Sequence, residues 1–285
     1  MATKPPAKPG AKSAQFPASP HRWGGNVPPS ANQTLRPQTP VRLAAQDQRQ
    51  ARPPSGLGLD SALVRQRMVE RLHSWGITDE RVLGAFAQVP RHQFVDSALI
   101  TQAYEDTSLP IGHGQTISKP LVIARMLSLA AAVRQAGPNT AAAMPRPLGK
   151  VLEIGTGCGY QAALLSVLGR SVFSVERIQA LHEKARIHLN QTGIDGVRLI
   201  WGDGNDGHPP NAPYDTIVSA AGGARLPQSW LDQLALGGVL VAPFESPGHG
   251  GQVLMRYEKT ASGWHHTVHD GVEFVPLKSG LLGQR

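Results

Sequence analysis

The stretch Val151-Leu152-Glu153-Ile154-Gly155-Thr156-Gly157-Cys158-Gly159-Tyr160 is the most informative segment of this chain. Its first residues are typical of a buried strand, three glycines follow on alternate positions, and residues 161–168 have the composition of a helix. Glycine lets the backbone bend sharply and lets a ligand approach closely, and the N-terminal amides of the helix favour a polar or charged ligand. The stretch therefore predicts a strand, a loop and a helix that bind a nucleotide-type cofactor.

From residue 150 onward, strand-like and helix-like segments alternate. Strands are expected at 150–154, 171–175, 197–201, 214–220 and 238–243, and helices at about 160–168, 178–191 and 227–235. This alternation predicts an α/β fold with a doubly wound, mostly parallel sheet, which binds its ligand at the C-terminal ends of the strands. Two more strands, near 251–258 and 264–270, are expected to close one edge as a hairpin.

The residues before the sheet predict a helical region. Apolar residues at helical spacing indicate a helix over 61–75 with Asp60 as its cap, and Thr78 is expected to cap a second helix. A third helix is expected over 118–133, with Ser118 as its N-cap.

The positive charge of the chain is concentrated at its N-terminus. The 285 residues carry a formal net charge of +8, but residues 1–55, with eight Lys or Arg and one acid, account for +7 of it. The same segment holds 11 of the 24 prolines and few large apolar residues, so it cannot bury enough surface to fold. We expect residues 1–57 to form a disordered, Pro-rich basic tail. Residues 58–285 are expected to form a single domain, with an N-terminal helical region (58–133), a flexible insertion (134–148) and a cofactor-binding α/β core (149–285).

Composition also restricts the location and the partners. With one cysteine the chain has no internal disulfide, which fits a cytoplasmic location, and no apolar run predicts a membrane-spanning helix or a secretory signal. Outside the tail the charge is nearly neutral, so we expect no specific nucleic-acid partner. The histidines at 265, 266 and 269 lack further ligands nearby, so no metal site is expected.

Acidic residues at two further strand ends select the cofactor. Glu176 follows the second strand, 21 residues after Gly155, where a carboxylate can accept hydrogen bonds from the ribose hydroxyls of an adenosine. Asp203 follows the third strand and is placed to meet the adenine amino group. A dinucleotide site requires a third glycine or alanine where this chain has Tyr160. These features favour S-adenosyl-L-methionine over NAD.

Three residues of the opening stretch also have expected roles. Thr156 belongs to the predicted cofactor loop. Glu153 is expected either to orient that loop or to meet the positively charged methionine end of the cofactor, and a purely structural hydrogen-bonding role is equally open. Cys158 is expected to be a small residue beside the cofactor and not a nucleophile, because no activating partner is identifiable.

Several segments closely resemble the protein-L-isoaspartate O-methyltransferase family. They are Pro90-Arg91-His92-Gln93-Phe94-Val95, Ala103-Tyr104-Glu105-Asp106, Leu109-Pro110-Ile111-Gly112-His113-Gly114-Gln115-Thr116-Ile117-Ser118, 152–161, Val175-Glu176-Arg177-Ile178, Gly202-Asp203-Gly204, Tyr214-Asp215-Thr216-Ile217-Val218 and Phe274-Val275-Pro276-Leu277. The resemblance covers about residues 60–280. The segment from Gln115 to Ser118 is the most particular to this family, because glycine loops occur in many methyltransferases.

The resemblance implies a Rossmann-like methyltransferase fold and a protein repair reaction. A methyl group passes from S-adenosyl-L-methionine to the free α-carboxylate of an L-isoaspartyl residue in a damaged protein or peptide. Ser118 corresponds to the family's active-site serine, and Gln115, Thr116 and Ile117 belong to the same substrate-binding segment. We expect a monomer. The alternatives are a methyltransferase acting on a small molecule or RNA, and a non-catalytic binding protein on the same fold.

The chain departs from the family pattern in two places. Lys119 and Leu121 follow the serine on either side of a proline, where the family commonly has Gln and Tyr. Gly222 and Gly223 replace a proline-containing turn after the fourth strand, which predicts a more flexible loop.

Overall fold

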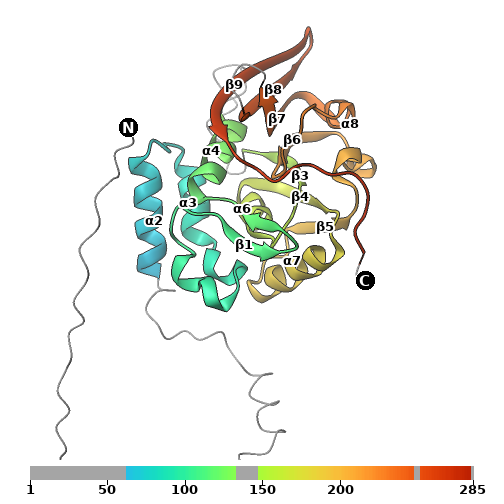
Figure 1. Cartoon of the computed structure of the whole chain (residues 1–285). Coiled ribbons are helices and arrows are strands. Elements are labelled where there is room, and N and C mark those ends of the chain that lie inside the picture. The colour runs from blue at the N-terminus through green and yellow to red at the C-terminus, as the bar shows by residue number, and fades with distance from the viewer. Residues whose placement is uncertain (1–61, 133–146, 247–250, 284–285) are drawn as a thin grey trace, which may run out of the picture. The chain divides into compact units, whose positions relative to one another are not determined.

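A computed structural model describes residues 62–132, 147–246 and 251–283 (Figure 1). The expectations for the tail, for Asp60 and for most of the 134–148 segment lie outside these residues. The helices are α2 (Ala62–Ser74), α3 (Glu80–Gln88), α4 (Pro120–Ala131), α6 (Tyr160–Leu168), α7 (Gln179–Gln191) and α8 (Gln228–Asp232). The strands are β1 (Leu109–Gly112), β2 (Gln115–Ile117), β3 (Gly149–Ile154), β4 (Gly169–Glu176), β5 (Val197–Trp201), β6 (Tyr214–Ser219), β7 (Leu234–Ser246), β8 (Gly251–Thr260) and β9 (Gly263–Val272). The described residues also contain four 3₁₀ turns: η1 (Arg91–Phe94), η2 (Ser97–Gln102), η3 (Gly204–Asp206) and η4 (Pro209–Asn211).

The centre of the molecule is a seven-stranded sheet with the order β5-β4-β3-β6-β7-β8-β9. The five strands from β5 to β7 run parallel, and β8 and β9 pair antiparallel at one edge as the predicted hairpin. The mostly parallel α/β sheet predicted from the alternation is therefore confirmed. The long hairpin formed by β8 and β9 projects beyond the other strands of the sheet in Figure 1.

Strand residues are buried on both faces of the sheet, because consecutive side chains point to opposite sides. On β3, Val151 packs into a cluster with α2, α3, α4, α6 and α7, whereas Leu152 and Ile154 pack into a second cluster with Trp230 of α8. The larger helices therefore cover one face, and α8 with the neighbouring 3₁₀ turns covers the other. Leu148, expected in the insertion, is fully buried and belongs to the core.

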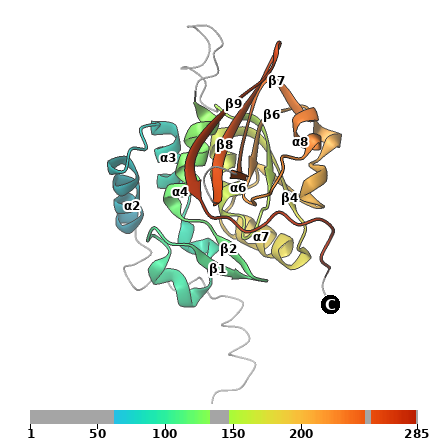
Figure 2. The ribbon, with the colours of Figure 1, turned by 45° about the horizontal axis from the view of Figure 1, so that its top comes forward.

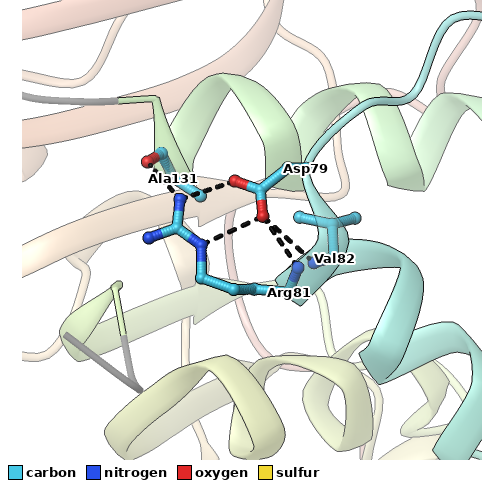
Figure 3. A network of polar contacts seen from close by, with 4 residues as sticks. All are labelled: Asp79, Arg81, Val82 and Ala131. Carbon is cyan, nitrogen blue, oxygen red and sulfur yellow. Dashed lines mark hydrogen bonds and ion pairs between the residues drawn. The ribbon is translucent and has the colours of Figure 1, made fainter. Parts of the chain in front are cut away.

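The N-cap of helix α3 lies one residue later than predicted. Asp79, not Thr78, is the N-cap, and its carboxylate accepts hydrogen bonds from the backbone N–H groups of Arg81 and Val82 (Figure 3). The Arg81 guanidinium pairs with the same carboxylate at 2.6 Å and also donates to the Ala131 carbonyl at the end of α4. The prediction failed because Thr and Asp are both good N-cap residues and only the backbone path selects between them.

After β9 the chain crosses the carboxyl edge of the sheet. Isolated bridges join Pro276 to Gly222 and Leu282 to Ile178, so this C-terminal segment lies over the ends of β6 and β4. Figures 1 and 2 both show it running from β9 toward α7. The segment thereby forms one wall of the space into which the parallel strands point.

Candidate active site

A cavity lies at the C-terminal ends of β3, β4 and β6, and its volume including the open mouth is about 840 Å³. Its walls include Ile154 at the end of β3, Gly155 directly after it, Glu176 at the end of β4 and Ala220 after β6. The strand order reverses between β3 and β6, which is where open α/β sheets bind their ligands.

The glycine loop has a backbone that other residues adopt only under strain. Gly155, Gly157 and Gly159 have φ values of 88°, 56° and 93°, in the left-handed region. A Cβ atom on Gly157 would lie 3.1 Å from Ile111, whose side chain also lines the cavity. Gly155, Thr156 and Gly157 line the cavity as predicted, whereas Gly159 is the N-cap of α6 and packs against Ala185 of α7.

Glu176 holds the loop in place from the end of β4. One carboxylate oxygen accepts a hydrogen bond from the Gly157 N–H at 2.9 Å, and the other accepts one from the Ile178 N–H at 2.8 Å. The side chain is 5% exposed, and burial raises its pKa although these amides favour the charged form. A carboxylate oxygen can accept more than one hydrogen bond, so this position leaves lone pairs for hydroxyl groups in the cavity.

Glu153 is fully buried beneath the loop. The Ser174 hydroxyl donates to Glu153 Oε2 at 2.5 Å and lies 2.5 Å from the hydroxyl of Thr156, so a polar chain leads from Glu153 to the loop. Burial raises the pKa of Glu153 to about 8, although the hydrogen bond from Ser174 by itself lowers the pKa. Neither Glu153 Oε1 nor Gln161 Nε2 makes a hydrogen bond of regular geometry among the described residues, but the Gln161 side chain lies near Glu153 and lowers the pKa of its carboxyl against the effect of burial.

Asp203 lies beside the cavity, not in its lining. Its Oδ1 accepts a hydrogen bond from the Asn205 N–H at 2.8 Å and thereby caps η3, and its Oδ2 accepts one from the Gly280 N–H at 2.5 Å. Burial opposes ionisation, but these hydrogen bonds hold the pKa of Asp203 below its usual value. The charged carboxylate thus fastens the C-terminal segment to the end of β5, while its neighbour Gly204 lines the cavity.

The residues of the predicted substrate segment come from the β1–β2 hairpin. All of them line the cavity: Gln115, Thr116, Ile117 and Ser118. Gly112 at the end of β1 and the two turn residues, His113 and Gly114, all have positive φ. Figure 2 shows this hairpin next to α4, which begins two residues after Ser118.

Ser118 is not the N-cap of α4, contrary to the prediction. The N-cap is Lys119, which has no capping side chain, and the Leu121 N–H instead donates to Asp106 Oδ1 at 2.9 Å. The Ser118 hydroxyl has no hydrogen-bond partner within the described part of the chain, and its carbonyl accepts a hydrogen bond from Arg91 at 2.9 Å. The prediction was wrong because the cap comes from a residue far away in the sequence.

A second, more open groove adjoins the first cavity. It lies between the start of α4 and the ends of β8 and β9, and its lining includes Lys119, Val122, Gln252 and Glu273. The two spaces share four lining residues: Thr116, Ser118, Val275 and Pro276. A ligand in the cavity and a longer ligand in the groove would therefore meet beside Ser118.

The walls formed by Ala220, Ala221 and residues 275–278 were not among the predicted site residues. Ala220 follows β6, so the rule for strand ends could have found it. Residues 275–277 belong to a segment that resembles the family, but nothing in the local sequence predicts a place in the site, because only the tertiary path brings residues 275–278 to the sheet edge.

The glycine turn after β6 was expected to be more flexible, but the structure ties it down. The Gly222 N–H donates to the Val275 carbonyl at 2.8 Å, the Gly222 carbonyl accepts from Leu277, and Gly223 exchanges two hydrogen bonds with β7. A Cβ atom on Gly222 would lie 2.4 Å from the Gln252 side chain. The absence of side chains on these glycines therefore allows the turn after β6 to lie close to the neighbouring strands and to residues 275–277.

Cys158 is buried, and burial raises its pKa, so its thiol stays protonated at neutral pH. In residues 62–132, 147–246 and 251–283, no three His, Cys, Asp or Glu side chains gather as metal ligands. None of the helices described has the length and apolar composition needed to cross a membrane.

This sheet order, with a cavity at the switch point and an acid at the end of the second parallel strand, places the chain among the α/β methyltransferases that use S-adenosyl-L-methionine. Within that class it belongs to the protein-L-isoaspartate(D-aspartate) O-methyltransferase family, which matches residues 63–282.

Relatives support this membership over most of the chain. A protein-L-isoaspartate O-methyltransferase of Methylibium petroleiphilum is 54% identical over 247 residues, covering 86% of this chain and 88% of that protein. One of Leptothrix cholodnii is also 54% identical and covers 86% and 84%.

Solved structures agree with the fold. A protein-L-isoaspartate O-methyltransferase has a TM-score of 0.64 at 26% identity and covers 76% of this chain and 67% of its own. A Plasmodium falciparum protein described as a protein-L-isoaspartate O-methyltransferase, solved with S-adenosyl-L-homocysteine, has a TM-score of 0.62 at 24% identity and covers 75% of this chain and 98% of its own.

Proposed function

We propose that this chain is a protein repair enzyme that moves a methyl group from S-adenosyl-L-methionine to the α-carboxylate of L-isoaspartyl residues in damaged proteins and peptides. The observation that carries the proposal is the meeting of the two spaces beside Ser118. The enclosed cavity suits a small cofactor, and the open groove suits a peptide chain. Transfer between two substrates requires such a meeting point.

The cavity residues fit the cofactor. Glu176 would accept hydrogen bonds from the ribose hydroxyls, the glycine loop would lie against the methionine part, and Glu153 would act through Ser174 and Thr156 on that loop. Asp203 is proposed to meet the adenine amino group at the cavity edge. When bound, S-adenosyl-L-methionine supplies an electrophilic methyl group on a positively charged sulfur.

Ser118 is proposed to position the substrate carboxylate and not to act as a base. A carboxylate with a pKa of about 4 is already ionised at neutral pH, so nothing has to remove a proton from it. The Ser118 hydroxyl can donate a hydrogen bond to one carboxylate oxygen and leave the other free to attack. Gln115, Thr116 and Ile117 line the same wall and would exclude water from the reacting atoms.

The decisive experiment uses two peptides that differ only in one linkage, aspartyl in one and isoaspartyl in the other. We expect the protein to transfer a labelled methyl group from S-adenosyl-L-methionine to the isoaspartyl peptide and not to its partner. Equal labelling, or none with either peptide, contradicts the proposal. In that case a methyltransferase for a small molecule or RNA, or a non-catalytic binding protein, becomes the better interpretation.

We also propose a cytoplasmic, monomeric protein with one catalytic domain over residues 58–285 and an N-terminal basic tail over 1–57. The single cysteine and the absence of any apolar run long enough to span a membrane support this location. Deletion of residues 1–57 is expected to leave the turnover number for the isoaspartyl peptide unchanged. Light scattering of the purified protein tests the monomer.

A further inference from the structure

Arg91 lies fully buried between the substrate side and the cofactor side of the active site. Its Nε donates to the Ala103 carbonyl at 2.7 Å, and its Nη2 donates to the Ser118 carbonyl at 2.9 Å. The guanidinium carbon lies 4.9 Å from the centre of the Tyr160 ring, and Tyr160 is the first residue of α6 after the glycine loop. One side chain therefore contacts both Ser118 and the element that carries the cofactor loop.

The loop from Ala103 to Thr107 provides a second contact to the segment that contains Ser118. Asp106 from this loop accepts the hydrogen bond of the Leu121 N–H, three residues beyond Ser118. Arg91 is itself anchored to this loop, through the carbonyls of Ala103 and Thr107. The backbone is thus held at the Ser118 carbonyl by Arg91 and at the Leu121 N–H by Asp106, and Arg91 is itself bound to the 103–107 loop that carries Asp106.

We infer that Arg91 and Asp106 are positioning residues that fix the Ser118 hydroxyl relative to the transferred methyl group. The inference rests on the proposed function of Ser118. A guanidinium suits this task because its donors lie in a rigid plane, so two carbonyls can be held at once. The helix end needs Asp106, because Lys119 provides no capping side chain.

The energetic reason is the sensitivity of methyl transfer to alignment. A displacement of about 1 Å caused by a mutation outside the reacting groups can slow a reaction about 100-fold. Neither residue lines the cavity or the groove, so loss of either should change the turnover number more than the affinity for either ligand. A purely structural role would instead lower thermal stability and leave the activity of the folded enzyme intact.

The test compares Asp106→Ala, Asp106→Asn and Arg91→Lys in the full chain. Asparagine keeps an oxygen that accepts the Leu121 hydrogen bond, whereas alanine does not. Lysine keeps the charge of Arg91 but cannot hold two carbonyls in one plane. The matched control is Arg256→Lys, because Arg256 donates to the Leu129 carbonyl at the opposite end of the same helix, α4.

We expect Asp106→Ala and Arg91→Lys to lower kcat for the isoaspartyl peptide by about 10-fold or more. The Kd of S-adenosyl-L-homocysteine, measured by calorimetry, should change by less than about 3-fold, since the cofactor walls are intact. Asp106→Asn should restore most of kcat, and Arg256→Lys should lower the melting temperature without lowering kcat.

The inference is overturned if Asp106→Ala keeps wild-type kcat, if asparagine does not restore the loss, or if Arg256→Lys reduces kcat equally. If circular dichroism shows that Arg91→Lys does not fold, the two Asp106 variants decide. Failure of the wild-type protein to methylate the isoaspartyl peptide refutes the proposed function instead, so the two failures are distinguishable.

Discussion

The Gly157 N–H donates a hydrogen bond to Glu176 Oε2 at 2.9 Å, which ties the glycine loop after β3 to the end of β4. The sequence suggested only that Glu176 would meet the ribose of the cofactor. In the structure the same carboxylate also supports the loop on which the cofactor would rest. One residue thereby sets both the position of the loop and the polarity of the cavity.

Glu176→Gln should weaken cofactor binding. The substitution removes a negative charge that accepts two backbone hydrogen bonds, and charge-assisted hydrogen bonds are about twice as strong as neutral ones. We expect the Kd of S-adenosyl-L-homocysteine to rise about 10-fold or more, while kcat at saturating cofactor changes less than about 3-fold. Glu183→Gln, at an exposed position on α7, is the control and should bind normally.

Ser118→Ala should lower kcat and leave the cofactor affinity unchanged. The hydroxyl is proposed to touch the substrate carboxylate only, and loss of one such hydrogen bond corresponds to about a 10- to 100-fold reduction in rate. The control is Ser166→Ala on α6, whose hydroxyl bonds within its own helix. A variant that methylates the isoaspartyl peptide at the wild-type rate removes the role assigned to Ser118.

Glu153 should make the stability of the protein depend on pH. Burial raises the pKa of Glu153 to about 8 in the folded state, against a value of 4.5 when exposed. Between these values the folded state holds a proton that the unfolded state has lost, so the free energy of unfolding decreases as pH rises. At its steepest the decrease is about 1.4 kcal/mol per pH unit.

Glu153→Gln should remove this slope. The glutamine stays neutral at every pH and still accepts the hydrogen bond from Ser174. Urea unfolding at about pH 5 and about pH 8 measures the effect, and the variant should gain stability relative to the wild type at the higher value. The other titrating groups are the same in both proteins. Parallel curves for the two proteins argue against a raised pKa at this position.

Gly84→Ala should stabilise the protein. Gly84 lies in the middle of α3, and a Cβ atom there meets no atom within 4 Å. Alanine restricts the unfolded chain, so we expect a gain of about 0.5–1 kcal/mol. The contrasting change is Gly157→Ala, where a positive φ and the contact with Ile111 predict a loss of stability and of cofactor affinity. Thermal melting measures the stability of both variants, and calorimetry measures their cofactor affinity. A lower melting temperature for Gly84→Ala than for the wild type contradicts the prediction.

Most secondary structure could be predicted because its signals are local. The helix expected at 160–168 matches α6, and the strand expected at 197–201 matches β5, since apolar runs and flanking turns specify both. The strand expected at 238–243 extends over Leu234–Ser246 and shortens the preceding helix to α8. Here pairing with β6 and β8 overrides the local preference.

The site shows the same division. The residues at the strand ends, such as Glu176 and the glycine loop, were predictable because parallel strands deliver their C-terminal ends to one edge. Three features were not predictable, because each joins segments that are separated in the chain. They are the cavity wall over 275–278, the hydrogen bond from Arg91 to the Ser118 carbonyl, and the hydrogen bond from the Leu121 N–H to Asp106.

The sequence alone specifies an α/β protein with a glycine loop and acidic residues at the strand ends. It also contains a serine segment that resembles the corresponding segment of the isoaspartyl methyltransferases. Burial of apolar strands and the conformational freedom of glycine are local properties, so residue order is enough to specify them. Only the tertiary structure decides where Ser118 lies relative to the cofactor cavity. That position depends on hydrogen bonds and packing among Arg91, Asp106 and Tyr160, which become neighbours only after the chain has folded.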